Sequence, residues 1–169
     1  MNLKWVAGPL LLTTSLFAAE APKPETEAAA AFARLKGLSG QWEAPIKDGV
    51  KSASYEVISG GSAVVERDTM DGMPPMLTVY YLDGDRLLLT HYCMAGNQPR
   101  MQARRFNPDS GELKFDFLDA TNLANPNAGH MHDATLRLVD NDHFSESWDF
   151  YLNGKVQMTE SAQFTRVHQ

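Results

Sequence analysis

Two pairs of residues could supply ligands to a transition metal. His130 and His132 are separated by one residue, and His91 and Cys93 have the same spacing. Residues two apart in a strand point to the same face, so each pair would present its donors together. Imidazole nitrogens and thiolate sulfurs are common zinc ligands, and three of them leave one position open for water or a substrate. The spacing raises the hypothesis of a metal site formed by His91, Cys93, His130 and His132.

The same four residues also have a structural interpretation, which we favour. Histidines at a barrel mouth are often satisfied by carbonyl groups, carboxylates or water. Cys93 is the only cysteine in the chain, and it could equally be a small buried hydrophobic residue. Because a single cysteine excludes an internal disulfide, the apolar core must hold the fold together.

A second set of residues is suited to a small organic ligand. Strand alternation places Phe115 and Phe117 on one face of their strand, and it places Glu146 beside Trp148. A carboxylate in such apolar company must be paired, protonated or hydrated. Apolar walls with a few polar groups are typical of ligand pockets. The candidate ligand-binding residues are Tyr55, Glu66, Asn97, Arg100, Phe115, Phe117, Glu146, Trp148 and Met158.

Asn97, Arg100 and the methionines near them leave alternatives open. Asn97 and Arg100 could contact an anionic or carbonyl group of a ligand, or they could brace their loop. Flexible thioether side chains suit an adaptable apolar surface, although ordinary core packing explains some of them. The methionines on or near this rim are Met70, Met73, Met76, Met94 and Met131.

The elements that would position these residues are one helix and many short strands. A helix that starts at Thr26-Glu27 is predicted to run to Leu38, with Gly37 near its end. From Gly40 onward, short runs rich in Val, Tyr, Phe, Thr and Leu alternate with turn residues, as in antiparallel barrels. The predicted fold is an all-β, antiparallel up-and-down barrel of about eight to ten strands. The strands are predicted at residues 40–46, 51–59, 62–70, 76–82, 86–93, 100–107, 112–119, 130–139, 143–152 and 155–167.

The turns divide into two groups, which define two ends of such a barrel. The turns at 60–61, 83–85, 108–111 and 140–142 are tight and would all lie at one end. The opposite end carries longer loops at 70–75, 94–99 and 119–129. Ligand sites favour mouths formed by long loops. Alternation predicts that His130 and His132, and also His91 and Cys93, face inward at this open end.

The first residues resemble a secretory signal peptide. Lys4 is followed by an apolar stretch and then by small residues around Ala18-Ala19, a layout that predicts cleavage after residue 19 and a periplasmic or secreted protein. The stretch is too short to span a bilayer. Residues 20–27 are predicted to be a linker, and residues 28–169 a single barrel domain. The formal net charge is −6, and its charges are interspersed, so a nucleic acid is a poor candidate partner.

The entry to the first strand resembles that of a known superfamily. A short helix followed by Gly40-Gln41-Trp42 is similar to the Gly-x-Trp entry of lipocalins and their calycin relatives. This resemblance implies that a basic residue on the last strand packs over the tryptophan, and Arg166 occupies that position. Other short lipocalin motifs are not found, so the closer likeness is to bacterial exported lipocalin-like domains of unknown function.

Three functions are compatible with these observations. The leading hypothesis is a binding barrel for a small apolar or amphipathic molecule. The alternative is a metal- or haem-dependent enzyme or sensor that uses the histidine-rich mouth. A third is an assembly module whose loops bind another protein of the cell envelope. The sequence contains no recognisable hydrolase triad, phosphate-binding glycine loop, CxxC pair or dinucleotide-binding motif, and it leaves the cofactor and the oligomeric state open.

Overall fold

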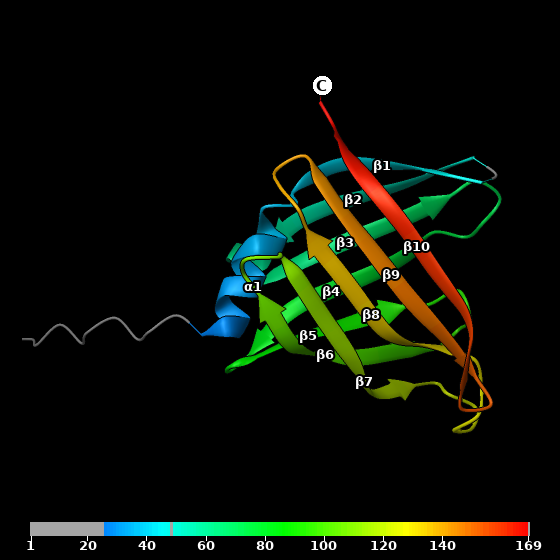
Figure 1. Cartoon of the computed structure of the whole chain (residues 1–169). Coiled ribbons are helices and arrows are strands. Elements are labelled where there is room, and N and C mark those ends of the chain that lie inside the picture. Colours follow the sequence, from blue (N-terminus) through cyan, green and yellow to red (C-terminus); the bar gives the residue numbers. More distant parts are fainter. Residues whose placement is uncertain (1–25, 48, 169) are drawn as a thin grey trace, which may run out of the picture.

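The computed structural model describes residues 26–47 and 49–168, which form one α-helix, one short 3-10 helix (Ser59–Gly61) and ten strands (Figure 1). The predicted signal peptide and residues 20–25 of the predicted linker lie outside the described residues. The elements are α1 (Glu27–Lys36), β1 (Gly40–Ile46), β2 (Gly49–Ile58), β3 (Ala63–Met70), β4 (Met76–Asp83), β5 (Arg86–Tyr92), β6 (Gln98–Asn107), β7 (Glu112–Thr121), β8 (His130–Leu138), β9 (His143–Leu152) and β10 (Lys155–Val167).

The strands form a closed antiparallel barrel in which each strand pairs with the next and β1 pairs with β10. The predicted up-and-down barrel is therefore confirmed, and each predicted strand boundary lies within two residues of the observed one. Closure between β1 and β10 is short and joins Gln41 to Val167, Trp42 to Arg166 and Glu43 to Thr165.

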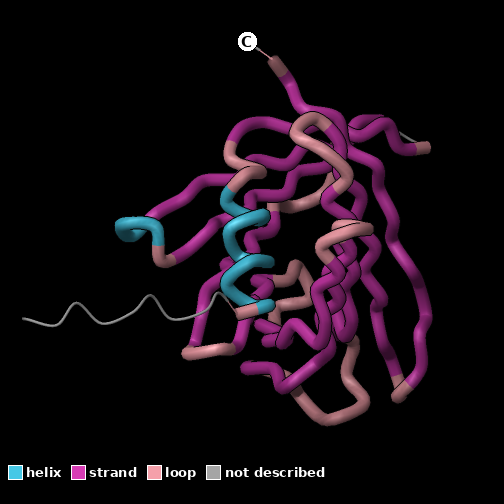
Figure 2. The backbone as a smooth tube through the Cα atoms, turned by 60° about the vertical axis from the view of Figure 1, so that its left-hand side comes forward, coloured by secondary structure: helices cyan, strands magenta, loops and turns pink. Residues whose placement is uncertain are grey.

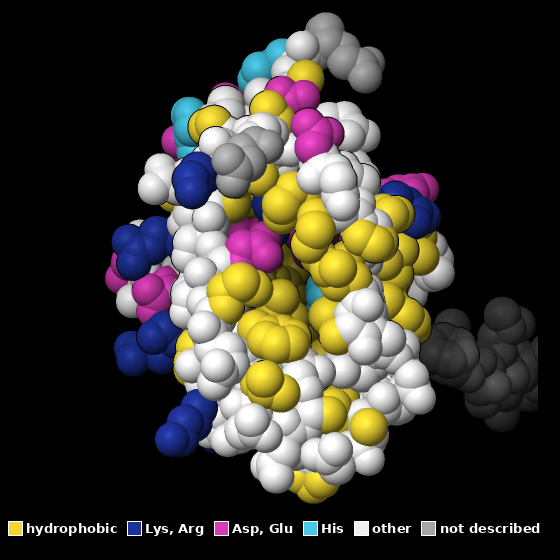
Figure 3. All heavy atoms as spheres, turned by 90° about the vertical axis from the view of Figure 1, so that its right-hand side faces the viewer, with side chains coloured by type: hydrophobic (Ala, Val, Ile, Leu, Met, Phe, Trp, Pro, Cys, Tyr) yellow, Lys and Arg dark blue, Asp and Glu magenta, His cyan; other side chains and the backbone are white. Residues whose placement is uncertain are grey.

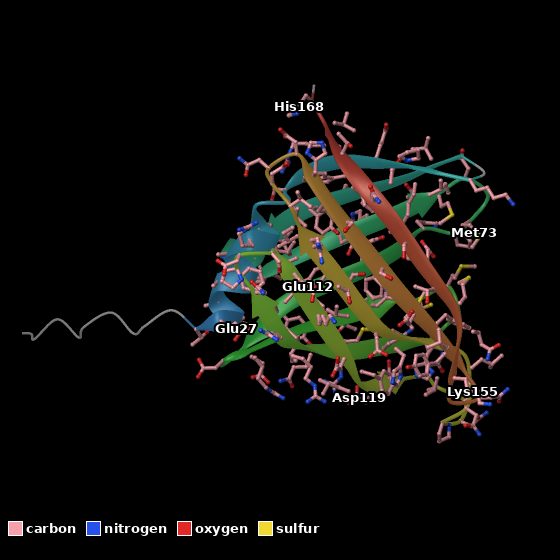
Figure 4. All side chains as sticks on the ribbon, in the orientation of Figure 1. Glu27, Met73, Glu112, Asp119, Lys155 and His168 are labelled. Carbon is pink, nitrogen blue, oxygen red and sulfur yellow. The ribbon has the colours of Figure 1, made fainter. Side chains whose placement is uncertain are left out.

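Helix α1 covers one end of the barrel (Figure 2). The side chain of Thr26 caps it by accepting a hydrogen bond of 3.1 Å from the backbone N–H of Ala29. Ala31, Phe32 and Leu35 are spaced to lie on one helix face, and all three are buried in the barrel core. The helix therefore closes this end, whereas Met73 in the loop after β3 lies at the opposite end (Figure 4).

Trp42 and Arg166 stack at the closed end, as the superfamily resemblance implies. The guanidinium carbon of Arg166 lies 4.1 Å from the centre of the Trp42 ring. Arg166 also donates hydrogen bonds to the carbonyl oxygens of Asn141, Ser39 and Gly37. Gly40 has a φ of +129°, and a Cβ there would lie 2.9 Å from Nη1 of Arg166, so only glycine lets the guanidinium approach this closely.

We expect Arg166→Ala to lower the free energy of unfolding by about 1–2 kcal/mol, because the ring contact and three hydrogen bonds are lost together. Urea unfolding followed by circular dichroism measures this change. Arg105→Ala removes the same side chain from an exposed position and should have little effect. Equal losses in the two variants would show that the stacked arginine does not stabilise the closed end.

No helix among residues 26–47 and 49–168 is long and apolar enough to cross a membrane.

Candidate functional site

A cavity of about 290 Å³ opens at the end of the barrel opposite α1. Its walls are mainly thioether and other apolar side chains, and they include six of the chain's eight methionines. Figure 3 shows hydrophobic side chains gathered around this hollow, with acidic side chains beside it. The lining residues, which we call the mouth, are Asp68, Met70, Met73, Pro74, Met76, Cys93, Met94, Ala95, Met131, Phe150, Met158 and Glu160.

Two of the three long loops that the sequence places at the open end contribute directly to the mouth. Met73 and Pro74 come from the loop between β3 and β4, and Met94 and Ala95 come from the loop between β5 and β6. The predicted division into a closed end and an open end is therefore confirmed. Met73 and Met94 are 44% and 50% exposed, so their flexible side chains can adjust to a molecule that enters.

Below the mouth, a second cavity of about 10 Å³ lies among polar side chains. It has room for about one water molecule. The two cavities share four lining residues, namely Asp68, Met76, Met131 and Glu160. The apolar mouth therefore leads directly to a polar interior.

Lys51 is the centre of this interior. Its ammonium nitrogen lies 2.7 Å from Oε1 of Glu146, 2.6 Å from Oε1 of Glu160 and 3.0 Å from Oδ2 of Asp68. The lysine side chain is 2% exposed. Burial alone would lower the pKa of Lys51, but Glu146 and Asp68 outweigh it and hold this pKa above its ordinary value. Lys51 is therefore a fixed buried cation.

Asp68, in contrast to Lys51, has a pKa that is shifted toward its uncharged form. Burial raises the pKa of Asp68 to about 6, because it outweighs the attraction of the Lys51 ammonium and is reinforced by the charge of Glu146. Asp68 therefore carries its charge at neutral pH and loses it in mild acid.

Glu66 forms a second buried group with two tyrosines. The hydroxyl of Tyr55 lies 2.8 Å from Oε1 of Glu66, and the hydroxyl of Tyr80 lies 2.6 Å from Oε2. Burial, followed by the charges of Glu146 and Asp68, raises the pKa of Glu66 to about 8. Glu66 is therefore mostly protonated at neutral pH, and its carboxyl O–H then donates to one of the two tyrosine oxygens.

His91 borders the inner cavity as a neutral ring. Its Nδ1 lies 3.0 Å from the Thr78 hydroxyl, and its ring centre lies 5.1 Å from that of Trp148. Burial, with a smaller effect from the Lys51 charge, lowers the pKa of His91 to about 4. The other ring nitrogen, Nε2, is buried and has no hydrogen-bond partner among the described residues. It is available to a molecule that reaches the inner cavity.

Several sequence-predicted residues lie in this interior. Glu66, Trp148 and His91 line the inner cavity, and Met158 and Cys93 line the mouth. Tyr55 and Glu146 reach the same network through Glu66 and Lys51. The predicted inward orientation of His91 and Cys93 is confirmed, whereas their roles in binding stay predictions.

The inward orientation predicted for His130 and His132 is wrong. Met131 pairs with Phe150 and Asp133 with Asp149, so β8 has one extra residue, His132, between two successive pairs. This bulge changes the face on which the following residues point. Met131 consequently faces the mouth, and the two histidines lie in a separate depression.

The two histidines pack with each other and with aromatic rings. Nε2 of His130 lies 3.1 Å from Nδ1 of His132, and the His132 ring stacks on Tyr151 and Phe117 at 3.9 and 4.6 Å between centres. Phe117 therefore belongs to this depression and does not line the lumen cavities. Among the described residues, no three His, Cys, Asp or Glu side chains are placed to hold one metal ion. The four predicted metal ligands are thus not brought together.

Three other candidates have structural partners. Arg100 is exposed and forms an ion pair with Asp119. The side-chain amide of Asn97 donates to the carbonyl oxygen of Gly129 at 2.8 Å, so Asn97 braces two loops against each other. Phe115 is buried 5.9 Å from the ring centre of Tyr80 and lines neither lumen cavity.

The predicted site residues omit four polar residues of the interior, namely Lys51, Asp68, Thr78 and Tyr80. The alternation that selected Tyr55 also places Lys51 on the inward face of β2, since the two are four residues apart. Asp68 follows Glu66 by two residues and shares its face of β3. A signal was therefore present, but isolated charged residues in strands are more commonly exposed.

Comparisons with known proteins support the fold alone. Family models and curated protein sequences gave no match. A solved structure described as the crystal structure of Rv2717c from M. tuberculosis is similar, with a TM-score of 0.55 and 15% sequence identity. The match covers 82% of this chain and 98% of that chain. At this identity, the likeness concerns the barrel and not its occupant.

Proposed function

We propose that the protein binds a small amphipathic organic molecule in the open end of its barrel. The observation that carries this proposal is the mouth, an apolar cavity of about 290 Å³ that leads to a buried polar cluster. This volume is near the lower end of the range of small-molecule pockets. The apolar part of the ligand would lie among the methionines, and its polar head would face Asp68 and Glu160.

We further propose that the protein does so after export, as a periplasmic or secreted lipocalin-like carrier. The signal-peptide pattern at residues 1–19 supports export, and the stack of Trp42 with Arg166 supports a calycin-like barrel. The metal- or haem-dependent alternative gains no support from the site, because His91 and Cys93 lie apart from His130 and His132.

The proposal is tested by NMR of protein labelled with [methyl-¹³C]methionine, titrated with octan-1-ol as a neutral probe. We expect the methyl signals of the six methionines in the mouth to move on binding. Met101 is fully buried in the core and lines neither lumen cavity, so its signal serves as an internal control. Equal shifts at Met101 and in the mouth, or no shifts at all, would contradict binding at this cavity.

We expect Met131→Gln to weaken octan-1-ol binding about tenfold. Met131 lines both cavities, and a polar amide of similar length would place a group with unmet hydrogen bonds against the apolar part of the probe. The matched control is Leu118→Gln, which makes a comparable change at an exposed position outside the mouth. If both variants bind the probe like the wild type, the mouth is not the binding site.

A further inference from the structure

The buried cluster below the mouth carries an excess of negative charge. One ammonium, that of Lys51, faces the three carboxylates of Asp68, Glu146 and Glu160. With all three carboxylates ionised, three negative charges against one positive charge leave a formal excess of two. A buried charge excess favours an opposite charge brought in from outside.

The hydrogen-bonding capacity of the cluster is similarly one-sided. An ammonium has three donors; Lys51 donates to Glu146 and Glu160 and forms an ion pair of 3.0 Å with Asp68, so its donors face these three carboxylates. Lys51 therefore has no further donor for a ligand. In contrast, Oδ1 of Asp68 and Oε2 of Glu146 are buried and have no hydrogen-bond partner among the described residues. The cluster therefore has unpaired acceptors on its carboxylates but no unpaired donor on Lys51.

Two of these carboxylates, those of Asp68 and Glu160, connect the cluster to the mouth. Asp68 and Glu160 line both the mouth and the inner cavity, so they stand at the boundary between apolar and polar surroundings. His91, which is 4% exposed, borders the inner cavity with an unpartnered Nε2, which donates or accepts according to the tautomer set by the contact of Nδ1 with Thr78. A head group at this boundary would meet the two carboxylates while its apolar body remained among the methionines.

We propose that the ligand's head group is an organic cation that donates hydrogen bonds, such as a protonated amine or an amidinium, held by Asp68 and Glu160. This inference rests on the proposed function and specifies the class of ligand. A carboxylate or phosphate head would add to the negative excess and find no free donor on Lys51. A neutral hydroxyl would satisfy one acceptor and leave the charge excess uncompensated.

A matched series of probes separates the head group from the body. Octylammonium, octan-1-ol and octanoate share one apolar chain and differ in the charge of the head at neutral pH. We expect octylammonium to bind at least tenfold more tightly than octan-1-ol, and octanoate to bind more weakly than both. Dissociation constants come from the shifts of the methionine methyl signals in the mouth.

The outcomes distinguish the two proposals. Equal affinity for octylammonium and octan-1-ol, or tighter binding of octanoate, would overturn the cationic head while the binding function stands. Binding of none of the three probes at the mouth would overturn the binding function and with it this inference. Octylammonium shifts confined to residues outside the mouth, with octan-1-ol still bound at the mouth, would overturn the cationic head alone.

Variants test whether the named carboxylates are responsible. Asp68→Asn and Glu160→Gln should each reduce the affinity for octylammonium about tenfold and change that for octan-1-ol less than about twofold. Glu56→Gln removes the same charge from an exposed position on β2 and should change neither. Circular dichroism confirms that each variant is folded. An unchanged preference for octylammonium in both Asp68→Asn and Glu160→Gln would contradict the assignment.

Discussion

Replacing Lys51 by methionine is expected to lower the free energy of unfolding at neutral pH by about 3–5 kcal/mol. Methionine has nearly the length of lysine but no charge, so the variant leaves the carboxylates of Glu146, Glu160 and Asp68 facing one another without their shared cation. Glu146 is 4% exposed and cannot recover this loss by contact with solvent. The cost is that of uncompensated buried charge rather than of lost packing.

Urea unfolding monitored by circular dichroism measures this loss. Lys114→Met makes the same replacement at an exposed position on β7 and should change the free energy of unfolding by less than about 0.5 kcal/mol. The destabilisation of Lys51→Met should shrink in the double variant Lys51→Met with Glu146→Gln, because one buried charge is then removed. A loss no larger than that of Lys114→Met would show that the carboxylates do not depend on Lys51.

The strands were predictable because two independent signals coincide along the chain. Runs with alternating apolar residues are separated by Gly-, Asn- and Asp-rich turns, and each tight turn allows only an antiparallel hairpin between neighbours. The last hairpin, with Asn153 and Gly154 both at positive φ, is an example. Barrel closure then follows from pairing the first strand with the last, which the positions of Trp42 and Arg166 already suggest.

The faces of the site residues were predictable only where alternation is unbroken. It holds along β9, where Glu146 and Trp148 both point inward as predicted. It fails at the start of β8, where the bulge at His132 places Met131 in the mouth instead of the histidines. One extra residue leaves no mark in composition or spacing, since it depends on how the strand meets its neighbour.

The buried charges were not predictable for a different reason. A lysine in a strand is stable inside a barrel only when several partners from other strands surround it. Lys51 on β2 meets Asp68 from β3, Glu146 from β9 and Glu160 from β10. These residues are separated by up to 109 positions in the chain, so their meeting is a property of the closed barrel.

The stability of the protein is expected to fall as the pH rises from about 6.5 to about 8, and Glu66 is the reason. Burial raises the pKa of Glu66 from 4.5 to about 8 in the folded protein. In this pH range the folded protein keeps the proton of Glu66, whereas the unfolded chain has already released it. The unfolded state, which binds fewer protons, is therefore increasingly favoured as the pH rises, and the free energy of unfolding decreases.

The groups around Glu66 do not cancel this effect. Tyr55 and Tyr80, which contact it directly, have pKa values raised well above 10. Asp68 has a folded pKa of about 6, below the range considered, and Lys51 stays protonated throughout it. His91 has a folded pKa of about 4 but an ordinary value of 6.5, so the unfolded chain releases this proton within the range and opposes the fall by about 0.4 kcal/mol. The expected net loss between pH 6.5 and pH 8 is about 1.5 kcal/mol.

Glu66→Gln is expected to abolish this fall and to leave the protein about 4 kcal/mol more stable than the wild type at pH 8, because the wild type loses stability over the whole range from the ordinary pKa of 4.5 to pH 8. The amide mimics the protonated carboxyl, since it accepts from one tyrosine hydroxyl and donates to the other, but it cannot ionise. Urea unfolding at intervals of pH between 6.5 and 8 measures the slope, and Glu56→Gln, an exposed change on β2, should retain it. A slope that persists in Glu66→Gln would mean that another group releases the proton and that Glu66 is already ionised in the folded barrel.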